Sequence, residues 1–301
     1  MGFLVLLNQS VLPIFIILAV AYIYFRVYQP DIKQLVNISL YTFSPAVVFN
    51  SLIKEGIGFS EIFKYLVLMV LVTAALMALG YIGAKLLRLS KTDVILFVMS
   101  VSMINIGNFG VPLIFFTYGQ EGIYPSILTF ISFNLPLVTI AIYLASGEPT
   151  IKGNVKDVLK IPIFHAAILA LIIASFEIPV PEVIMKVTGF LGQAAFPFMI
   201  FILGLQLATI KLNPGLIKAA LASVGIKLVA APFVIAAILG FMSFEGLSYS
   251  VALIQLSGPS AILPLMYAIR FGRNADLLAA AILLSTALSA ITLPIVIYFA
   301  G

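Results

Sequence analysis

Residues 102–116 read SMINIGNFGVPLIFF, an apolar stretch that is interrupted where a membrane helix should be continuous. Five of its residues weaken an α-helix, because they add backbone freedom, offer competing hydrogen bonds or remove a backbone donor: Asn105, Gly107, Asn108, Gly110 and Pro112. Backbone groups released inside a membrane need new partners, so the interruption points to a second feature elsewhere in the chain.

The composition is that of an integral membrane protein. Of the 301 residues, 63% are hydrophobic and 9% are charged, and the mean hydropathy is +1.22. Apolar runs of about 20 residues recur along the chain, each long enough as a helix to cross roughly 30 Å of hydrocarbon. The runs do not alternate in polarity, which favours helices over a transmembrane barrel. The expected fold class is therefore an all-α integral membrane protein.

Ten runs predict ten transmembrane helices, at residues 6–25, 34–53, 63–86, 94–118, 123–145, 161–176, 183–207, 215–241, 247–270 and 275–299. If both termini lie on one side, the loops that follow odd-numbered spans hold twelve lysines and arginines, and the loops on the other side hold three. This asymmetry predicts a multi-pass protein of the plasma membrane with both termini outside and a short cytoplasmic loop at 147–160.

Prolines recur along the chain at a fixed interval. Pro45 and Pro197 are 152 residues apart, and so are Pro112 and Pro264. These matches pair the second span with the seventh and the fourth with the ninth. Because five spans is an odd number, a second copy enters the membrane from the opposite face, so the repeat is inverted. The two predicted five-helix repeats are residues 1–146 and 161–301.

A second interruption, IQLSGPSAILPL at residues 254–265, occupies the equivalent place in the second repeat. At the same interval Asn105 aligns with Ser257, and Asn108 with Ser260. Each free backbone group in hydrocarbon costs several kcal/mol, so we expect the two breaks to cross near mid-membrane. Half-helix N-termini at such a crossing would attract an anion. The alternative is a pair of ordinary kinks relieved by neighbouring polar side chains.

Lys227 lies deep inside a predicted span, about 18 Å along the eighth helix and therefore near the middle of the bilayer. A lysine at that depth costs several kcal/mol and marks function by default. It could serve as a counter-charge for an anionic substrate, as a proton-linked switch, as a stand-in for a coupling cation, or as a structural cation bonded to freed carbonyls.

The candidate substrate-binding residues are the polar side chains at the breaks and in neighbouring spans: Asn105, Asn108, Gln255, Ser257, Ser260, Lys227 and Asn134. The helix breakers of the predicted crossing are Gly107, Gly110, Pro112, Gly258 and Pro264.

Several chemistries have no support in the sequence. There is no cysteine, no phosphate-binding loop, no metalloprotease motif and no paired intramembrane carboxylate, so we expect neither an enzyme nor a metal or other cofactor. All acidic residues lie in or near loops, which makes sodium coupling less favoured than proton coupling or no coupling. Nothing indicates a nucleic-acid partner.

The motifs NIGNFGVPL at 105–113 and GPSAILPL at 258–265, with ten spans and a short central loop, resemble the auxin efflux carrier family. That family includes PIN-type auxin carriers and prokaryotic malate or malonate permeases, and its fold resembles that of sodium/proton antiporters. The resemblance implies a homodimeric elevator, with a scaffold of spans one, two, six and seven and a transport domain of spans three to five and eight to ten. It places Asn105, Asn108, Gln255, Ser257 and Ser260 at the crossover.

The predicted function is secondary active transport or uniport of small organic anions by alternating access. Auxin-like monocarboxylates and malate- or malonate-type dicarboxylates both fit, because amides, hydroxyls and a lysine would serve either. The alternative is a membrane receptor or sensor for a small organic acid that retains the transporter fold.

Overall fold

The computed structural model describes residues 3–56, 58–146 and 161–301, and the regular elements in these ranges are helices. The predicted all-α class is thereby confirmed. The predicted cytoplasmic loop at 147–160 lies outside the described residues.

The first half of the chain consists of α1 (Phe3–Leu6), η1 (Leu7–Val11), α2 (Leu12–Tyr28), α3 (Ile32–Ile38), η2 (Ser39–Phe43), α4 (Ser44–Glu55), α5 (Phe59–Leu86), α6 (Lys91–Ser102), η3 (Ile106–Gly110), α7 (Val111–Tyr118) and α8 (Ile123–Ser146). Adjoining pieces combine into longer helical stretches, for example from Phe3 to Tyr28.

The second half consists of α10 (Pro162–Ser175), α11 (Glu182–Leu207), η4 (Pro214–Leu216), α12 (Ile217–Gly225), η5 (Ile226–Ala230), α13 (Ala231–Phe241), α14 (Gly246–Leu256), α15 (Leu263–Arg270) and α16 (Asp276–Ala300). Helical segments therefore occupy all ten stretches predicted from the sequence. In the described ranges, seven helices are long and apolar enough to cross a membrane, and three shorter apolar helices accompany them. A multi-pass helical membrane protein is confirmed, and the number of ten spans stays a prediction.

In the part of the chain that the structure describes, four helical stretches contain one π turn each: η1, η2, η3 and η5. A proline follows every one of them within the first two residues of the next helix, namely Pro13, Pro45, Pro112 and Pro232. A proline ring clashes with the carbonyl one turn back and has no N–H to offer it. The wider turn inserts one residue, so that the Ala231 N–H, for example, reaches the carbonyl of Ile226 five residues back.

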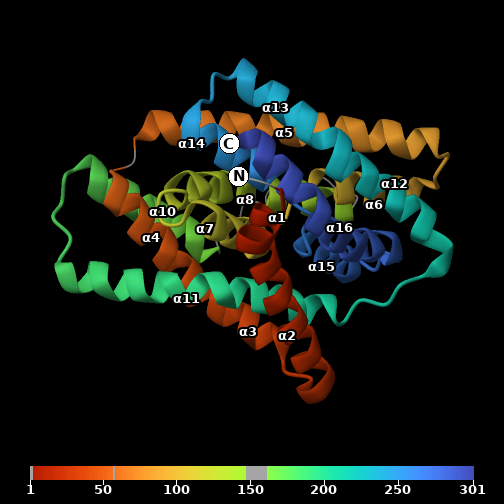
Figure 1. Ribbon diagram of the computed structural model, residues 1–301, viewed down its shortest axis with the longest axis horizontal. Helices are drawn as coiled ribbons and strands as arrows, with labels where there is room; N and C mark the ends of the chain where they lie inside the picture. The colour runs from red at the N-terminus through yellow and green to blue at the C-terminus, as the bar shows by residue number, and fades with distance from the viewer. Residues whose placement is uncertain (1–2, 57, 147–160) are drawn as a thin grey trace.

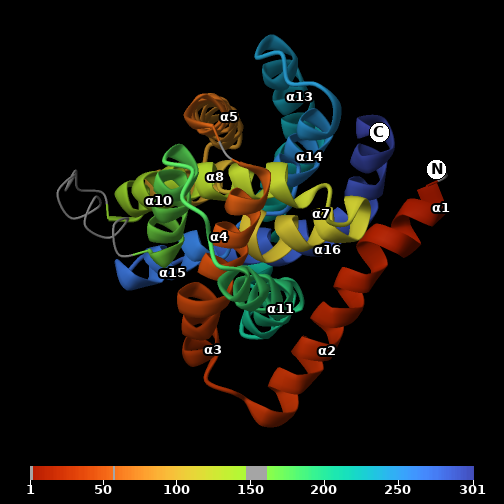
Figure 2. The same ribbon diagram turned by 90° about the vertical axis from the view of Figure 1, so that its left-hand side faces the viewer.

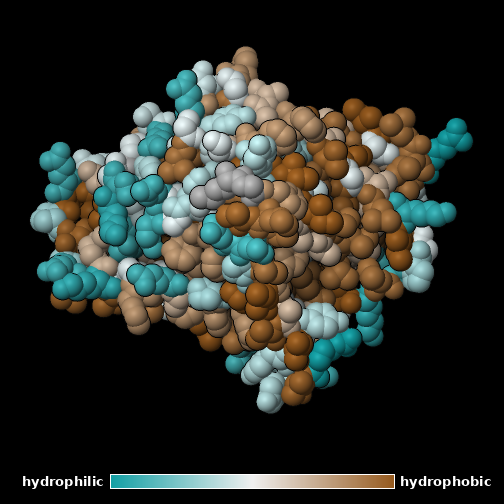
Figure 3. All heavy atoms as spheres, viewed as in Figure 1, coloured by the Kyte–Doolittle hydropathy of each residue, from teal (hydrophilic) through white to brown (hydrophobic). Residues whose placement is uncertain are grey.

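The helices are arranged around the two interrupted segments. In both ribbon views, α5 and α11 lie on opposite sides of the molecule with α7 and α8 between them, and the two termini lie near each other (Figure 1, Figure 2). Apolar side chains cover much of the middle of the face shown in Figure 3, and hydrophilic ones gather toward its edges. This distribution suits a protein whose centre is embedded in hydrocarbon.

Close helix packing depends on two glycines of α11. A Cβ at Gly192 would lie 3.0 Å from the Val47 Cα in α4. At Gly204 it would lie 2.7 Å from the Leu18 carbonyl oxygen and 2.6 Å from the Ala21 Cβ, both in α2. The absent side chains let the backbones approach, as is common where membrane helices pack.

We expect Gly204→Ala to lower the thermal unfolding midpoint of the detergent-solubilised protein, since overpacking costs about 1–3 kcal/mol. Gly240→Ala is the matched control, because Gly240 is also helical and a Cβ there meets nothing within 4 Å. The control should be neutral or slightly stabilising. Equal midpoints for the two variants would contradict the packing described.

Candidate functional site

The two interrupted segments lie against each other. Ile104 and Ser260 form an isolated antiparallel bridge. The Asn105 N–H donates to the Pro259 carbonyl at 2.9 Å, and the Ala261 N–H donates to the Met103 carbonyl at 2.9 Å. Backbone groups that lost their helical partners in one break therefore find them in the other, as burial in an apolar interior requires.

Local sequence fixes where each helix stops and resumes. Helix α6 ends at Ser102 and α14 ends at Leu256, and both are followed by extended or bent residues. The chain resumes helical structure at η3, and at α15 with Pro264 near its start, where a missing N–H costs nothing. Helix C-termini with partial negative charge and N-termini with partial positive charge thus come together at one place.

Asn105 is the most constrained candidate in the first break. Its side chain is 6% exposed, and its Nδ2 has no hydrogen-bond partner among the described residues. Its backbone carbonyl accepts from the Gly110 N–H at 3.0 Å. Asn108, in η3, is half-buried, and Pro112 is buried in the first turn of α7.

The two glycines of this break leave room for side chains from other helices. A Cβ at Gly107 would lie 2.6 Å from the Phe130 ring of α8. A Cβ at Gly110 would lie 3.2 Å from the Gln255 Cγ of α14. Gly110 therefore lies beside a polar candidate of the second break, and both glycines allow the crossing to be compact.

In the second break, the side-chain amide of Gln255 has its nitrogen hydrogen-bonded and its oxygen unpartnered among the described residues. Its Nε2 donates to the Ser126 hydroxyl of α8 at 2.8 Å, whereas its Oε1 has no partner among the described residues. The Ser257 hydroxyl is also buried without a partner there. At Gly258, a Cβ would lie 3.0 Å from the Gln255 carbonyl oxygen, which favours glycine.

Ser260 is fully used by the protein itself. Its hydroxyl donates to the Ser100 carbonyl at 2.6 Å, and its N–H donates to the Ser285 hydroxyl at 3.1 Å. The sequence alignment treats Ser260 and Asn108 as equivalents, but the structure gives Ser260 a bracing role between α6 and α16. Its predicted part in substrate binding stays untested.

Two further candidates lie outside the break segments. The Asn134 Nδ2 donates to the Phe130 carbonyl of its own helix at 2.7 Å, so its donor is used locally. Lys227 lies in the π turn η5, is 0% exposed, and its Nζ has no hydrogen-bond partner among the described residues. The π turn packs against α5, α6 and α16, and two of these helices also bond to Ser260.

Three serines that sequence reasoning did not single out support the crossing: Ser100, Ser126 and Ser285. They lie on α6, α8 and α16, and all three are buried. Small polar residues inside apolar spans are the signal that could have indicated Ser126 and Ser285, whose hydroxyls accept hydrogen bonds from the second break. Ser100 contributes its backbone carbonyl, and its own hydroxyl donates to the Phe97 carbonyl at 2.8 Å, so its side chain gives no such signal.

The chemistry available at the crossing is that of neutral donors and acceptors. Three unpartnered buried atoms come from it, namely Asn105 Nδ2, Gln255 Oε1 and Ser257 Oγ. A buried polar atom without a partner costs about 1–3 kcal/mol, so these atoms favour a polar ligand. No group of three or more metal-binding side chains occurs in the part of the chain that the structure describes.

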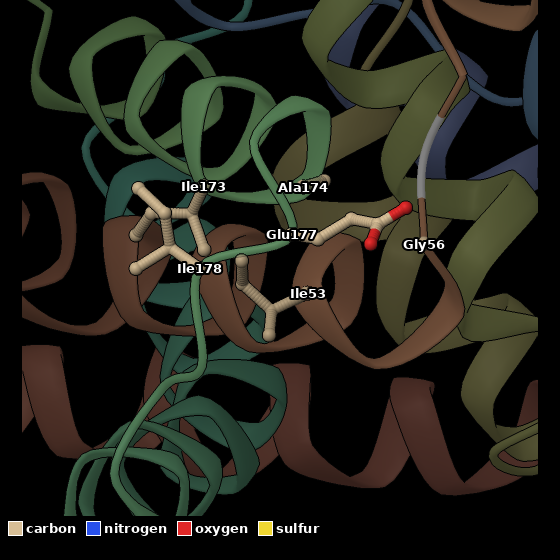
Figure 4. A pocket seen from close by; sticks show the side chains of 6 residues that line it. All are labelled: Ile53, Gly56, Ile173, Ala174, Glu177 and Ile178. Carbon is tan, nitrogen blue, oxygen red and sulfur yellow. The ribbon is translucent and has the colours of Figure 1, made fainter.

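A cavity of about 300 Å³ lies elsewhere, between the ends of α4 and α10. Figure 4 shows Ile53, Ile173 and Ile178 along one side of it and the Glu177 carboxylate near Gly56. None of its lining residues comes from the crossing, and it has a single charged group. We do not assign it to the predicted site.

Residues 149–297 match a family model described as membrane transport protein. This match lies in the second half of the chain and shows what that half is similar to. The resemblance to the auxin efflux carrier family that the two motifs predicted is confirmed. The chain is also 26% identical over 267 residues to an uncharacterized transporter of Methanothermobacter thermautotrophicus, covering 87% of this chain and 86% of that protein.

A second relative in the family, an uncharacterized transporter of Methanocaldococcus jannaschii, is 26% identical over 266 residues. That similarity covers 85% of this chain and 86% of the relative. The similarity to both proteins thus includes the first half of the chain as well, with its interrupted segment at 103–110.

The two serines of the second break should respond differently to removal of the hydroxyl. Ser260→Ala deletes a buried hydrogen bond, which contributes about 0.5–1.5 kcal/mol to the free energy of unfolding. This variant should therefore have a lower thermal midpoint than the unaltered protein without substrate. Ser257→Ala removes a hydroxyl without a protein partner and should leave the midpoint unchanged or raise it. Thermal melts of both variants in one detergent test this, and the reverse ranking would contradict the bonding described.

Proposed function

We propose that this chain is a secondary transporter of small organic anions across the plasma membrane, with its substrate site at the crossing of the two interrupted helices. The observation that carries the proposal is the meeting of these breaks in the interior, where Asn105, Gln255 and Ser257 present polar atoms that have no partner among the described residues. The match of residues 149–297 to a membrane transport family model supports it.

The substrate charge is inferred from what surrounds the crossing. Half-helix N-termini and the Asn105 amide offer hydrogen-bond donors to a carboxylate. The buried carboxylate groups that a cationic substrate would need are absent from the described residues, whose buried charged side chain is Lys227. We therefore favour mono- or dicarboxylates, with Lys227 as the counter-charge.

Helix packing supports ten spans in two inverted repeats. Helix α11 packs against α2, and α10 packs against α4, which are equivalent pairs if the sixth to tenth spans repeat the first to fifth. The third span contacts the fifth (α5 with α8), and the eighth contacts the tenth (α12 with α16), as the same repeat requires. Both termini outside would follow from the distribution of basic residues.

An elevator mechanism fits the grouping of helices. Helices α2, α4, α10 and α11 pack on one another and would form the scaffold and a homodimer interface. Helices α5, α6, α8, α12, α14 and α16 pack among themselves and would carry the crossing. Segment η3 contacts α11, so the substrate would sit beside the boundary along which the transport domain slides.

The membrane potential alone can drive such transport in one direction. Export of one negative charge from an inside-negative cell gains about 2.3 kcal/mol per 100 mV. Uncoupled export of a monoanion therefore needs no ion gradient, and proton coupling remains a second route. Proteoliposomes with imposed voltage, pH and sodium gradients would distinguish these routes.

We expect Asn105→Ala and Ser257→Ala to raise the KM for the transported acid at least about tenfold, the value of one lost hydrogen bond to a charged group. Saturable uptake and counterflow of labelled mono- and dicarboxylates into proteoliposomes measure this. Thr139→Ala is the control, because that hydroxyl donates to the Leu135 carbonyl of its own helix on the exposed side of α8.

If both variants fold correctly and their KM values are unchanged, the substrate site does not lie at the crossing. A sensor that retains the fold is the alternative function. Such a protein would bind an acid saturably and show no counterflow with any of the acids it binds.

Lys227→Met should abolish anion transport without loss of stability. Methionine is of similar length, and replacing a buried unpaired charge by an apolar group is often neutral or stabilising. Thermal melts and counterflow on the same preparation separate the two effects. Retained transport would refute the counter-charge, whereas a large drop in the thermal midpoint would indicate a structural cation.

A further inference from the structure

A groove of about 390 Å³ runs between α5, α6 and α8, and the proposed transport mechanism makes no use of it. Its walls are Met77, Ala78 and Tyr81 of α5, Val94, Ile95 and Val98 of α6, and Leu144 of α8. Val94 and Val98 are buried at its floor, whereas Ala78 and Tyr81 are exposed. The groove is thus an apolar furrow that opens outward from the helix bundle.

The groove exists because α5 and α6 meet closely beside it. A Cβ at Gly80 would lie 3.1 Å from the Val98 Cα and 3.3 Å from the Val101 Cβ. This contact holds the two backbones together along one line and leaves a shallow trough next to it. The width of the trough is set by side chains of fixed, packed helices, so it suits an elongated apolar ligand.

Two lysines stand at one end of the groove in helical register with its walls. Lys85 follows Tyr81 by four residues and Ala78 by seven, and its Nζ lies 5.4 Å from the centre of the Tyr81 ring. Lys91 precedes Val94, Ile95 and Val98 by three, four and seven residues, so it lies on the same face of α6. Both lysines are exposed.

The charge at this end is positive. Arg88 lies in the turn between the two helices. The nearby Asp93 carboxylate accepts from the hydroxyl of Ser90, the N-cap residue of α6, at 2.7 Å. Among the described residues, neither Lys85 nor Lys91 is in an ion pair, so both ammonium groups are available to an anion.

The geometry points to a binding site for an anionic phospholipid, independent of the transported substrate. One acyl chain would lie in the groove against Val94 and Val98. The phosphate headgroup would lie between Lys85 and Lys91, where the ends of α5 and α6 reach the membrane interface. The Tyr81 ring lies between the apolar and the charged parts, the position that tyrosine favours at membrane interfaces.

The chain contains no tryptophan, so Tyr81→Trp creates a single fluorescent reporter in the groove. We would reconstitute it in bilayers containing phosphatidylcholine and phosphatidylglycerol, with brominated chains on one lipid at a time. Bromine quenches a nearby tryptophan, so the quenching ratio reports which lipid occupies the groove. Phe233→Trp, at a side chain 75% exposed on α13, is the control reporter.

The expected result is preferential quenching by brominated phosphatidylglycerol at position 81, at least about fivefold in relative association constant, the effect of one lysine near an anionic headgroup. Position 233 should show a ratio near one. The double variant Lys85→Gln/Lys91→Gln should abolish the preference of position 81 for phosphatidylglycerol. The control double variant Lys211→Gln/Lys218→Gln should retain it.

Native mass spectrometry of the unaltered chain supplies an independent measurement. Retained phosphatidylglycerol should exceed phosphatidylcholine at equal supply, and the Lys85/Lys91 pair variant should lose this excess. Equal quenching by both lipids at position 81, or a preference that survives removal of both lysines, would overturn the proposal. Transport activity is not part of either readout, so the lipid site and the proposed function can fail separately.

Discussion

The structure depends on one constraint, which is that backbone polar groups inside an apolar interior must be paired. Two helices stop before they have crossed the molecule, at Ser102 and Leu256, and residues 103–105 and 257–262, which follow them, are not helical. Either break alone would leave several donors and acceptors without partners. Together they form a short antiparallel pairing, with Asn105 bonded to Pro259 and Ala261 to Met103. Each break is therefore stable only because the other supplies its backbone hydrogen-bond partners.

A proline in a helix of this protein can leave the helix unbroken, follow a π turn or accompany a break. Pro13 and Pro232 follow a π turn and continue the helix, while Pro136 and Pro294 lie within unbroken α-helices. Unwinding occurs only where glycines and short polar side chains accompany the proline and a second chain segment supplies hydrogen bonds. A proline by itself bends or widens a membrane helix, and the partner segment permits a break.

Polar side chains at the crossing divide into those that brace the fold and those left for a ligand. Ser260 and Ser126 are occupied by hydrogen bonds within the protein, whereas Ser257 and Asn105 keep polar atoms free. The two breaks are thus similar in sequence, but their polar side chains differ in whether the protein itself hydrogen-bonds them. Such inequality suits a site that must hold one asymmetric molecule, because two equivalent halves would offer it the same groups twice.

The sequence by itself determined the helical membrane class, the positions of the helical segments, the two breaks and their partnership, because hydropathy and helix-breaking residues act locally and the prolines recur at one interval. It could not distinguish Ser257 from Ser260, or predict that Ser100, Ser126 and Ser285 would support the crossing. Those roles depend on which side chains from distant helices lie within about 3 Å, and only tertiary packing decides such distances. The groove beside Gly80 has the same origin, since it requires α5 and α6 in contact.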